Sequence, residues 1–382
     1  MKYPFYLTLS LIALCTACSN DVEKDIILKS ASNTISFNAS APGVTRAQDL
    51  NTGNLAEISA SAIWRNSATQ ATYFSQVPFV RNGQAFVSGA PYYWPEEGTL
   101  DFHAYAPSGN SQAAYDATNK KFTVTPDGSD DSTSQVDLIY ANTNGRTRAH
   151  MVSSGSVKGI PLNFRHTESK VSVKVKNSST TMRFYVSGYK LAYVSKSGVF
   201  EYGKSGAYDN GTIGPGTLRY ADWTPSEASV TDTYIQSLSN VCVNPGSDAS
   251  LLTATGHDWI LVPQTHDMAS SYTGTDALTP ANGSYLSFDV EIRNNDDNVV
   301  EGRNGHVIYS GWAMWPVSLN LAPGYHYTYT VDLSGGGYYE TNHTDINPGK
   351  PDLDPILGDA VIRFDLEVKP WIHQDVSGVT VR

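Results

Sequence analysis

The sequence predicts an all-β protein built of two β-sandwiches. Short runs of alternating apolar and polar residues recur at intervals of about 10–15 residues, and Gly, Pro, Asn and Asp separate them. The chain is rich in Tyr (23 residues), Gly (31) and Pro (19), which suits pleated strands joined by turns. Its 382 residues are enough for two such domains.

The first residues are typical of an export signal. Lys2 precedes an apolar run from Phe5 to Ala17, which is too short for a membrane-spanning helix and suits a signal-peptide core. The run ends in Thr16-Ala17-Cys18, which resembles a bacterial lipobox, although Cys15 stands where Leu is usual. We therefore expect a signal peptide at residues 1–17 and lipidation at Cys18. Ordinary signal-peptidase cleavage at the small residues is the alternative.

A short strand and an accessible loop follow this signal. Residues 19–34 are polar and mixed in charge, which indicates a tether. The run "TISFNAS" then alternates Ile35, Phe37 and Ala39 on one face, as a strand does. Next comes "APGVTRAQDL", a turn-prone stretch with Arg46 and Ala47 at its centre. Nothing in its composition alone distinguishes it from an ordinary loop.

The remaining strands fall into two groups. A polar, Gly- and Ser-rich stretch at residues 143–160 predicts a domain boundary, which gives an N-terminal sandwich at 47–155 and a C-terminal one at 156–382. The first group contains "LAEISASAIW", "ATYFSQVPFV", "YYWPEEGTLDFHAYAP", "KKFTVTP" and "QVDLIYANTN". The second contains "IPLNFRHTESKVSVKVKN", "RFYVSGYKLAYV", "DWILVPQTHD", "SYLSFDVEIRN", "SLNLAPGYHYTYTVDL" and "VIRFDLEVKPW".

Composition and motifs argue against several classes of function. The net charge is −11 and no dense Lys/Arg run occurs, so we expect no nucleic-acid partner. The sequence contains no H-E-x-x-H, no G-x-S-x-G and no phosphate loop, and its nine His are scattered. We therefore expect no enzyme, no metal site and no cofactor. Asp- and Asn-rich stretches at 292–305 and 344–355 favour turns, with calcium binding left open.

The order of several blocks resembles the Bacteroidetes fimbrillin-like family, the subunits of type V pili. The resemblance spans residues 35 to the end. It rests on the leader ending at Cys18, on "ISFNAS" followed by "VTRAQ", and on "YYWPEEGTLDFHAYAP", "VDLIYA", "IPLNFRHTESKVSVKV", "ILVPQ", "LNLAPGYHYTYTVDL" and "IRFDLEVKPW".

The resemblance implies a fold and a mode of assembly. It implies two transthyretin-like β-sandwich domains in a subunit that reaches the outer membrane as a lipoprotein. An Arg-specific protease would cut after Arg46, which makes Ala47 the new N-terminus. Loss of the first strand, with Ile35, Phe37 and Ala39, would open a groove for a C-terminal segment of the next subunit. The implied partners are other copies of the chain or related pilins.

Alternation near the C-terminus agrees with such a donor. Pro370 and Trp371 end the run "VIRFDLEVKPW", so we expect that run to be the subunit's own last strand. The following "DVSGVTVR" supplies the candidate donor residues Val376, Val379 and Val381. The alternative function is a non-polymerising outer-membrane lipoprotein that binds glycans or host ligands, including a tip or anchor role in a pilus.

Overall fold

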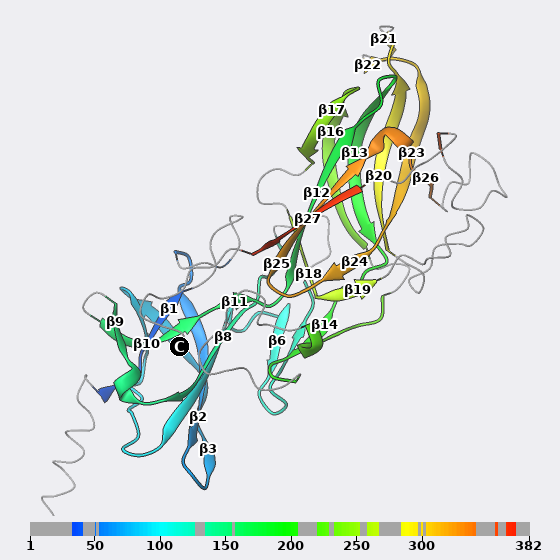
Figure 1. Cartoon of the computed structure of the whole chain (residues 1–382). Coiled ribbons are helices and arrows are strands. Elements are labelled where there is room, and N and C mark those ends of the chain that lie inside the picture. Colours follow the sequence, from blue (N-terminus) through cyan, green and yellow to red (C-terminus); the bar gives the residue numbers. More distant parts are fainter. Residues whose placement is uncertain are drawn as a thin grey trace, which may run out of the picture.

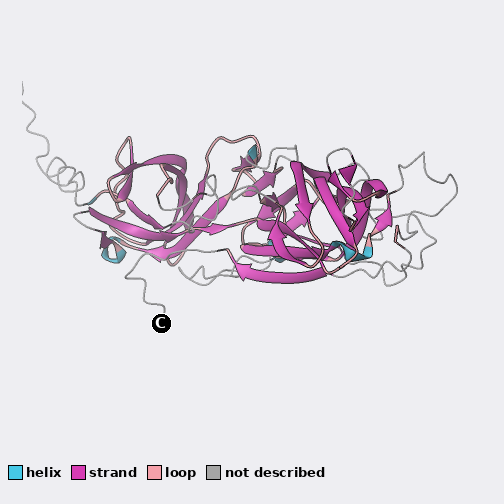
Figure 2. Ribbon diagram, turned by 90° about the horizontal axis from the view of Figure 1, so that it is seen from above, coloured by secondary structure: helices cyan, strands magenta, loops and turns pink. Residues whose placement is uncertain are grey.

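The computed structural model shows an all-β protein, as the sequence predicts. It describes residues 33–40, 50, 53–126, 134–154, 157–204, 220–228, 233–252, 258–266, 284–296, 299–300, 303–340, 356–357 and 364–371. The helical elements within these ranges are three-residue 3-10 turns, η3 (Arg148–His150), η4 (Tyr220–Asp222) and η5 (Leu333–Gly335). Two lobes follow one another along the long axis of the molecule (Figure 1, Figure 2).

The first lobe is a nine-stranded sheet in the order β11-β8-β5-β2-β3-β4-β1-β10-β9. Phe164 alone separates β10 from β11, and β11 pairs with β8 at the other end of this order, so the sheet curls back on itself. The strands are β1 (Phe37–Ser40), β2 (Glu57–Arg65), β3 (Gln70–Asn82), β4 (Ala85–Ser88), β5 (Thr99–Ala106), β8 (Ile139–Arg146), β9 (Val152–Ser154), β10 (Val157–Asn163) and β11 (Arg165–His166).

The core of this lobe is aromatic and aliphatic. Alternate residues of each strand point inward, because successive side chains of a strand face opposite sides of the sheet. The buried residues include Phe37, Phe79, Phe102, Ile160 and Leu162. This core therefore contains side chains from the first described strand and from β10, which lie far apart in the sequence.

The second lobe is a β-sandwich whose two sheets share one core. One sheet has the order β17-β12-β25-β27, with β18 also paired to β12, and the other has the order β16-β13-β20-β23-β26. The first contains β12 (Ser169–Asn177), β17 (Ser247–Leu251), β18 (Trp259–Leu261), β25 (Tyr325–Asp332) and β27 (Phe364–Pro370). The second contains β13 (Met182–Ala192), β16 (Thr233–Val243), β20 (Ser284–Asn294), β23 (Val307–Val317) and β26 (Tyr338–Tyr339).

A four-stranded sheet lies between the lobes and takes strands from both halves of the chain (Figure 1). Its order is β15-β14-β7-β6, so β7 of the first half pairs with β14 of the second. Its strands are β6 (Ala113–Asp116), β7 (Lys121–Val124), β14 (Gly198–Glu201) and β15 (Trp223–Pro225). We call it the bridging sheet. Two further ribbons are β19 (Gln264–His266) with β24 (Leu319–Leu321), and β21 (Val299–Val300) with β22 (Arg303–Asn304).

The division into domains at 47–155 and 156–382 stays a prediction, as does the transthyretin-like topology of each. The expected boundary falls between β9 and β10, which pair with each other in the first sheet. The first core continues as far as Phe164. Pairing across this stretch links the segments on either side of it more closely than its Gly- and Ser-rich composition indicates.

Candidate functional site

The candidate site is the position of β1 within the first sheet. β1 pairs in parallel with β10 over four residues, from Phe37 opposite Ile160 to Ser40 opposite Asn163. On its other side, Phe37 pairs with Phe86 of β4. Just before β1, the Ile35 amide donates to the carbonyl of Tyr92 at 2.7 Å. The strand therefore has neighbours on both sides and is not an edge strand.

The three residues expected on the apolar face of this strand lie on the core side. Phe37 is fully buried, and its ring packs nearly perpendicular to the rings of Phe79 (4.8 Å) and Phe102 (5.1 Å). Ile35 is also buried, and Ala39 is partly buried against the same core. Edge-to-face contacts of this kind add to the free energy of burying the ring. β1 is thus bound chiefly through Phe37.

Asn38 of β1 and Ser36, just before the strand, attach it to β9 and β10. The Ser36 hydroxyl donates to the carbonyl of Lys158 at 2.5 Å, and the Asn38 amide donates to the carbonyl of Val152 at 2.9 Å. Gly159 lies directly against β1. A Cβ added at Gly159 would lie 2.7 Å from the Phe37 carbonyl carbon and 2.8 Å from the Asn38 nitrogen. This role of Gly159 cannot be read from the sequence, because a glycine within a Gly- and Ser-rich stretch resembles a linker residue.

Several expected site residues lie outside the described residues. These are Cys18, Arg46, Ala47, Val376, Val379 and Val381. Leu50 is the first described residue after the expected cleavage site, and Trp371 is the last before the expected donor segment.

Leu50 and Trp371 are connected through a buried polar pair. The Leu50 amide donates to Asp137 Oδ2 at 2.9 Å, and Asp137 Oδ1 lies 2.7 Å from Nδ1 of His166. The side chains of Asp137 and His166 are each 1% exposed. The His166 ring stacks on Trp371, with ring centroids 3.6 Å apart and planes 11° from parallel. We call this chain of contacts the Asp137–His166 link.

The surroundings of this link are charged and buried. The backbone amide of Leu138 donates to both carboxylate oxygens of Glu168, at 3.2 and 3.1 Å. Burial raises the pKa of Glu168 well above its ordinary value, and the nearby Asp137 raises it further. The Lys170 ammonium lies 5.6 Å from the centre of the Trp371 ring, within the range of a cation–π contact. Trp371 is therefore held by stacking and by charge as well as by burial.

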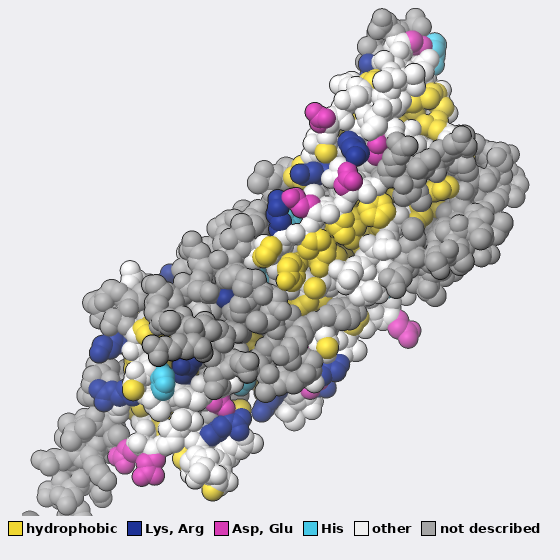
Figure 3. All heavy atoms as spheres, viewed as in Figure 1, with side chains coloured by type: hydrophobic (Ala, Val, Ile, Leu, Met, Phe, Trp, Pro, Cys, Tyr) yellow, Lys and Arg dark blue, Asp and Glu magenta, His cyan; other side chains and the backbone are white. Residues whose placement is uncertain are grey.

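β27 is the described strand closest in sequence to the expected donor segment. It pairs antiparallel with β25 from Phe364 to Pro370 and forms one edge of its sheet. Leu366 and Val368 pair with the buried Tyr329 and Tyr327, yet they are 44% and 47% exposed. Figure 3 shows hydrophobic side chains gathered along the middle of the face on which β27 runs in Figure 1. The last strand therefore presents an apolar face that the described residues leave uncovered.

Within the described residues, no group of His, Cys, Asp and Glu side chains could hold a metal ion. No helix among these residues has the length and apolar character needed to cross a membrane. Cys242 is a free, exposed cysteine.

Comparison with known proteins identifies a family. A family model described as fimbrillin-like matches residues 45–351, which includes most of both lobes but neither β1 nor β27. The curated proteins give no match.

Similar solved structures include those of three candidate cell adhesion proteins. The Bacteroides ovatus protein is 14% identical with a TM-score of 0.45, and the match covers 91% of this chain and 100% of that protein. The Parabacteroides distasonis protein is 10% identical with a TM-score of 0.46, and the match covers 88% of this chain and 96% of that protein. The Bacteroides uniformis protein is 13% identical with a TM-score of 0.43, and the match covers 89% of this chain and 98% of that protein.

Proposed function

Because the chain belongs to the fimbrillin-like family, we propose that it is a structural subunit of a cell-surface pilus that polymerises by strand exchange and supports adhesion. The observation that carries this proposal is the position of β1. It is a short strand with neighbours on both sides, and one aromatic side chain, Phe37, fills the core beneath it. Removal of this strand would leave a groove between β4 and β10 that another strand of the same size can fill.

Export and anchoring come first in this proposal. Residues 1–17 are removed as a signal peptide, and Cys18 receives the lipid that anchors the precursor to the outer membrane. Residues 19–34 then connect the lipid to β1.

Maturation follows by cleavage after Arg46. The cut makes Ala47 the N-terminus and allows β1 to leave. Loss of β1 exposes unpaired backbone groups on β4 and β10, which can then accept a new strand. It also removes Ile35 and Phe37 from the core, a loss of about 3–6 kcal/mol of burial free energy at about 1.5–3 kcal/mol per side chain. The cleaved subunit is therefore less stable until the groove is filled.

The replacement strand comes from the next subunit. Val379 and Val381 are two residues apart, as are Phe37 and Ala39, so either pair places both side chains on one face of a strand. Val376 adds an apolar contact upstream. In the subunit that donates it, this segment begins just after Trp371, which the Asp137–His166 link connects to Leu50. The link thus brings together Leu50 and Trp371, the described residues that flank the proposed cleavage loop and the proposed donor segment.

We further propose that the mature chain forms two transthyretin-like sandwich domains, at 47–155 and 156–382. The shared core of the second lobe supports this for the second domain. The curled first sheet supports a sandwich for the first domain, although its strands β10 and β11 lie beyond residue 155.

The experiment is digestion of the purified precursor with an Arg-specific protease. We expect N-terminal sequencing to find Ala47, and gels of unboiled samples to show a ladder of polymers after cleavage. The Arg46→Ala variant should remain uncleaved at this position and monomeric. Polymers from the Arg46→Ala variant would rule out the proposed activation.

A further inference from the structure

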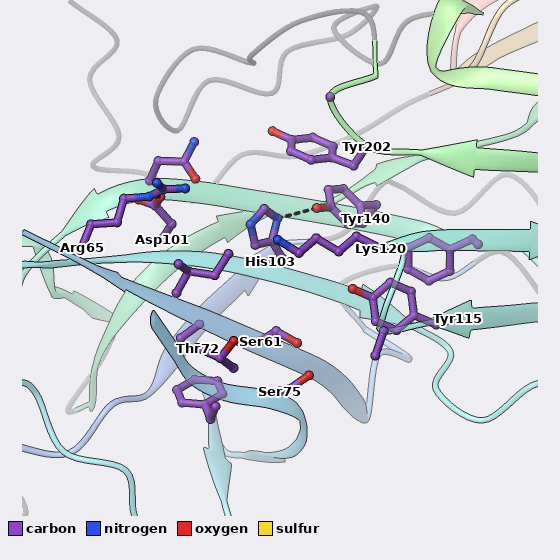
Figure 4. A pocket seen from close by; sticks show the side chains of 17 residues that line it. Ser61, Arg65, Thr72, Ser75, Asp101, His103, Tyr115, Lys120, Tyr140 and Tyr202 are labelled. Carbon is purple, nitrogen blue, oxygen red and sulfur yellow. Dashed lines mark hydrogen bonds and ion pairs between the residues drawn. The ribbon is translucent and has the colours of Figure 1, made fainter. Parts of the chain in front are cut away.

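A cavity of about 330 Å³ lies between the first sheet and the bridging sheet (Figure 4). Residues of β2, β3, β5 and β8 line one side, and residues of the β6–β7 hairpin and of the turn after β14 line the other. No residue of β1 lines it. Its volume falls at the lower end of small-molecule sites, which span about 300–1,000 Å³.

The backbone around the cavity is irregular. The pairing of β2 with β3 shifts register twice between Ala60 and Ile63, next to the lining residues Ser61 and Ala62. Gln76 and Lys120 have left-handed conformations, with φ of 51° and 55°. Bulges and strained residues are over-represented beside binding sites, where they set the direction of a side chain. Here Lys120 itself lines the cavity, at the end of the β6–β7 turn.

The charged groups of the cavity leave one positive charge without a counterion. Arg65 is paired with Asp101. Lys120 extends toward the His103 ring (Figure 4), and it has no hydrogen-bond or ion-pair partner among the residues described. Burial, with a smaller contribution from the charge of Lys120, lowers the pKa of His103 to about 4, so His103 is neutral at neutral pH. The cavity is thus suited to a ligand with one negative charge.

Uncharged polar groups also line the cavity. The side chains of Thr72, Ser75 and Asn144 make no hydrogen bond to any other residue that the structure describes. Hydroxyl and amide groups both donate and accept, so they match the hydroxyls of a polyol.

Two tyrosines present part of their rings to the cavity, and each ring packs against another aromatic ring. Tyr202 packs on Tyr140, with ring centroids 4.7 Å apart, and Tyr115 packs on Phe122 at 4.6 Å. Both Tyr202 and Tyr115 are half-buried lining residues. Rings fixed in this way lose little conformational entropy on binding, and each offers an apolar face beside polar groups. A pyranose ring, with C–H groups on its faces and hydroxyls at its edge, complements this arrangement.

We propose that this cavity binds a saccharide that carries one carboxylate, of the uronic or sialic acid class. The carboxylate pairs with Lys120, the hydroxyls bond to Thr72, Ser75 and Asn144, and the ring stacks on Tyr115 or Tyr202. This assignment goes beyond the assembly role and is independent of strand exchange, because β1 contributes nothing to the cavity.

The test is isothermal titration calorimetry of the purified full chain with sodium glucuronate, glucose and sodium acetate. We expect glucuronate to bind at least tenfold more tightly than glucose or acetate. Lys120→Gln should remove this preference. The neighbouring Lys121→Gln is the matched control, because Lys121 pairs with Glu201 at 3.1 Å and does not line the cavity. Tyr115→Ala should weaken glucuronate binding about tenfold, and Tyr115→Phe should retain it.

Three results would overturn the assignment. Equal affinity for glucose and glucuronate would show that the carboxylate of the ligand does not contribute to binding. Equal affinity for acetate and glucuronate would show that the cavity binds a carboxylate alone and does not recognise the sugar ring. Unchanged glucuronate binding by a folded Lys120→Gln protein would place the ligand elsewhere. Because uncleaved precursor is used throughout, none of these results bears on whether Arg46 is cut.

Discussion

Gly159 shows at the scale of one residue how closely β1 fits its neighbours. A methyl group here would meet the backbone of Phe37 and Asn38 at distances below 3 Å. We therefore predict that Gly159→Ala destabilises the precursor by about 1–3 kcal/mol, as overpacking does elsewhere. Urea unfolding measures this, and Gly89→Ala is the control, because a Cβ there meets nothing within 4 Å. Equal stability of both variants would show that β10 tolerates a shift away from β1.

His103 gives a prediction about pH. Its folded pKa is about 4, below its ordinary value of 6.5, so the fold favours the neutral ring. As pH falls from 6.5 toward 4, the unfolded chain binds a proton that the folded chain does not, and the free energy of unfolding decreases. Urea midpoints at pH 7 and at about pH 4.5 should differ less in His103→Asn than in the unchanged protein. Identical pH dependence in both proteins would contradict the buried, neutral state of this ring.

Alternation identifies Ile35, Phe37 and Ala39 at the residue scale, because period two alone determines which side chains share a face. It does not identify Gly159, His166 or Lys120. Their roles depend on close approach and on pairing between residues distant in the sequence. The contact of Asp137 with Leu50, for example, spans 87 positions.

At the scale of elements, the proposed strand exchange implies that β1 stabilises only the precursor. Phe37→Ala should therefore lower the free energy of unfolding of the uncleaved chain by about 3–5 kcal/mol, the usual loss for a buried Phe. After cleavage and assembly, the same substitution should have no effect, because the strand that carries it has left. Thermal unfolding of precursor and polymer separates the two states. An equal loss of stability in both would show that β1 remains in the assembled subunit.

The bridging sheet is the element that the sequence analysis did not predict. The three-residue β15 lies in a Gly-rich stretch that is typical of a loop, whereas β7 and β14 are short and alternating, so their existence is foreseeable. Their pairing is not, since β7 and β14 lie in different halves of the chain and no local pattern records the contact between Phe122 and Phe200.

At the scale of the whole molecule, the two lobes have separate roles in the proposed assembly. The first lobe accepts a strand and the second supplies one from beyond Trp371. Deleting residues 374–382 should therefore leave a folded protein that is cleaved after Arg46 but stays monomeric. Size-exclusion chromatography after cleavage measures this. Fibres of ordinary length from the truncated chain would mean that the donor lies elsewhere, for instance in β27 with its exposed Leu366 and Val368.

The most direct measurement is a disulfide trap between subunits. Cys242→Ser removes the exposed native thiol, and cysteines are then placed at Asn163, opposite Ser40 of β1, and in turn at positions 378–381. We predict reducible cross-links between subunits after cleavage, at alternate positions of the scan, and none when Arg46→Ala is also present. Cross-links that form equally in the uncleavable chain, or at no position after cleavage, would contradict replacement of β1 by the tail of the next subunit.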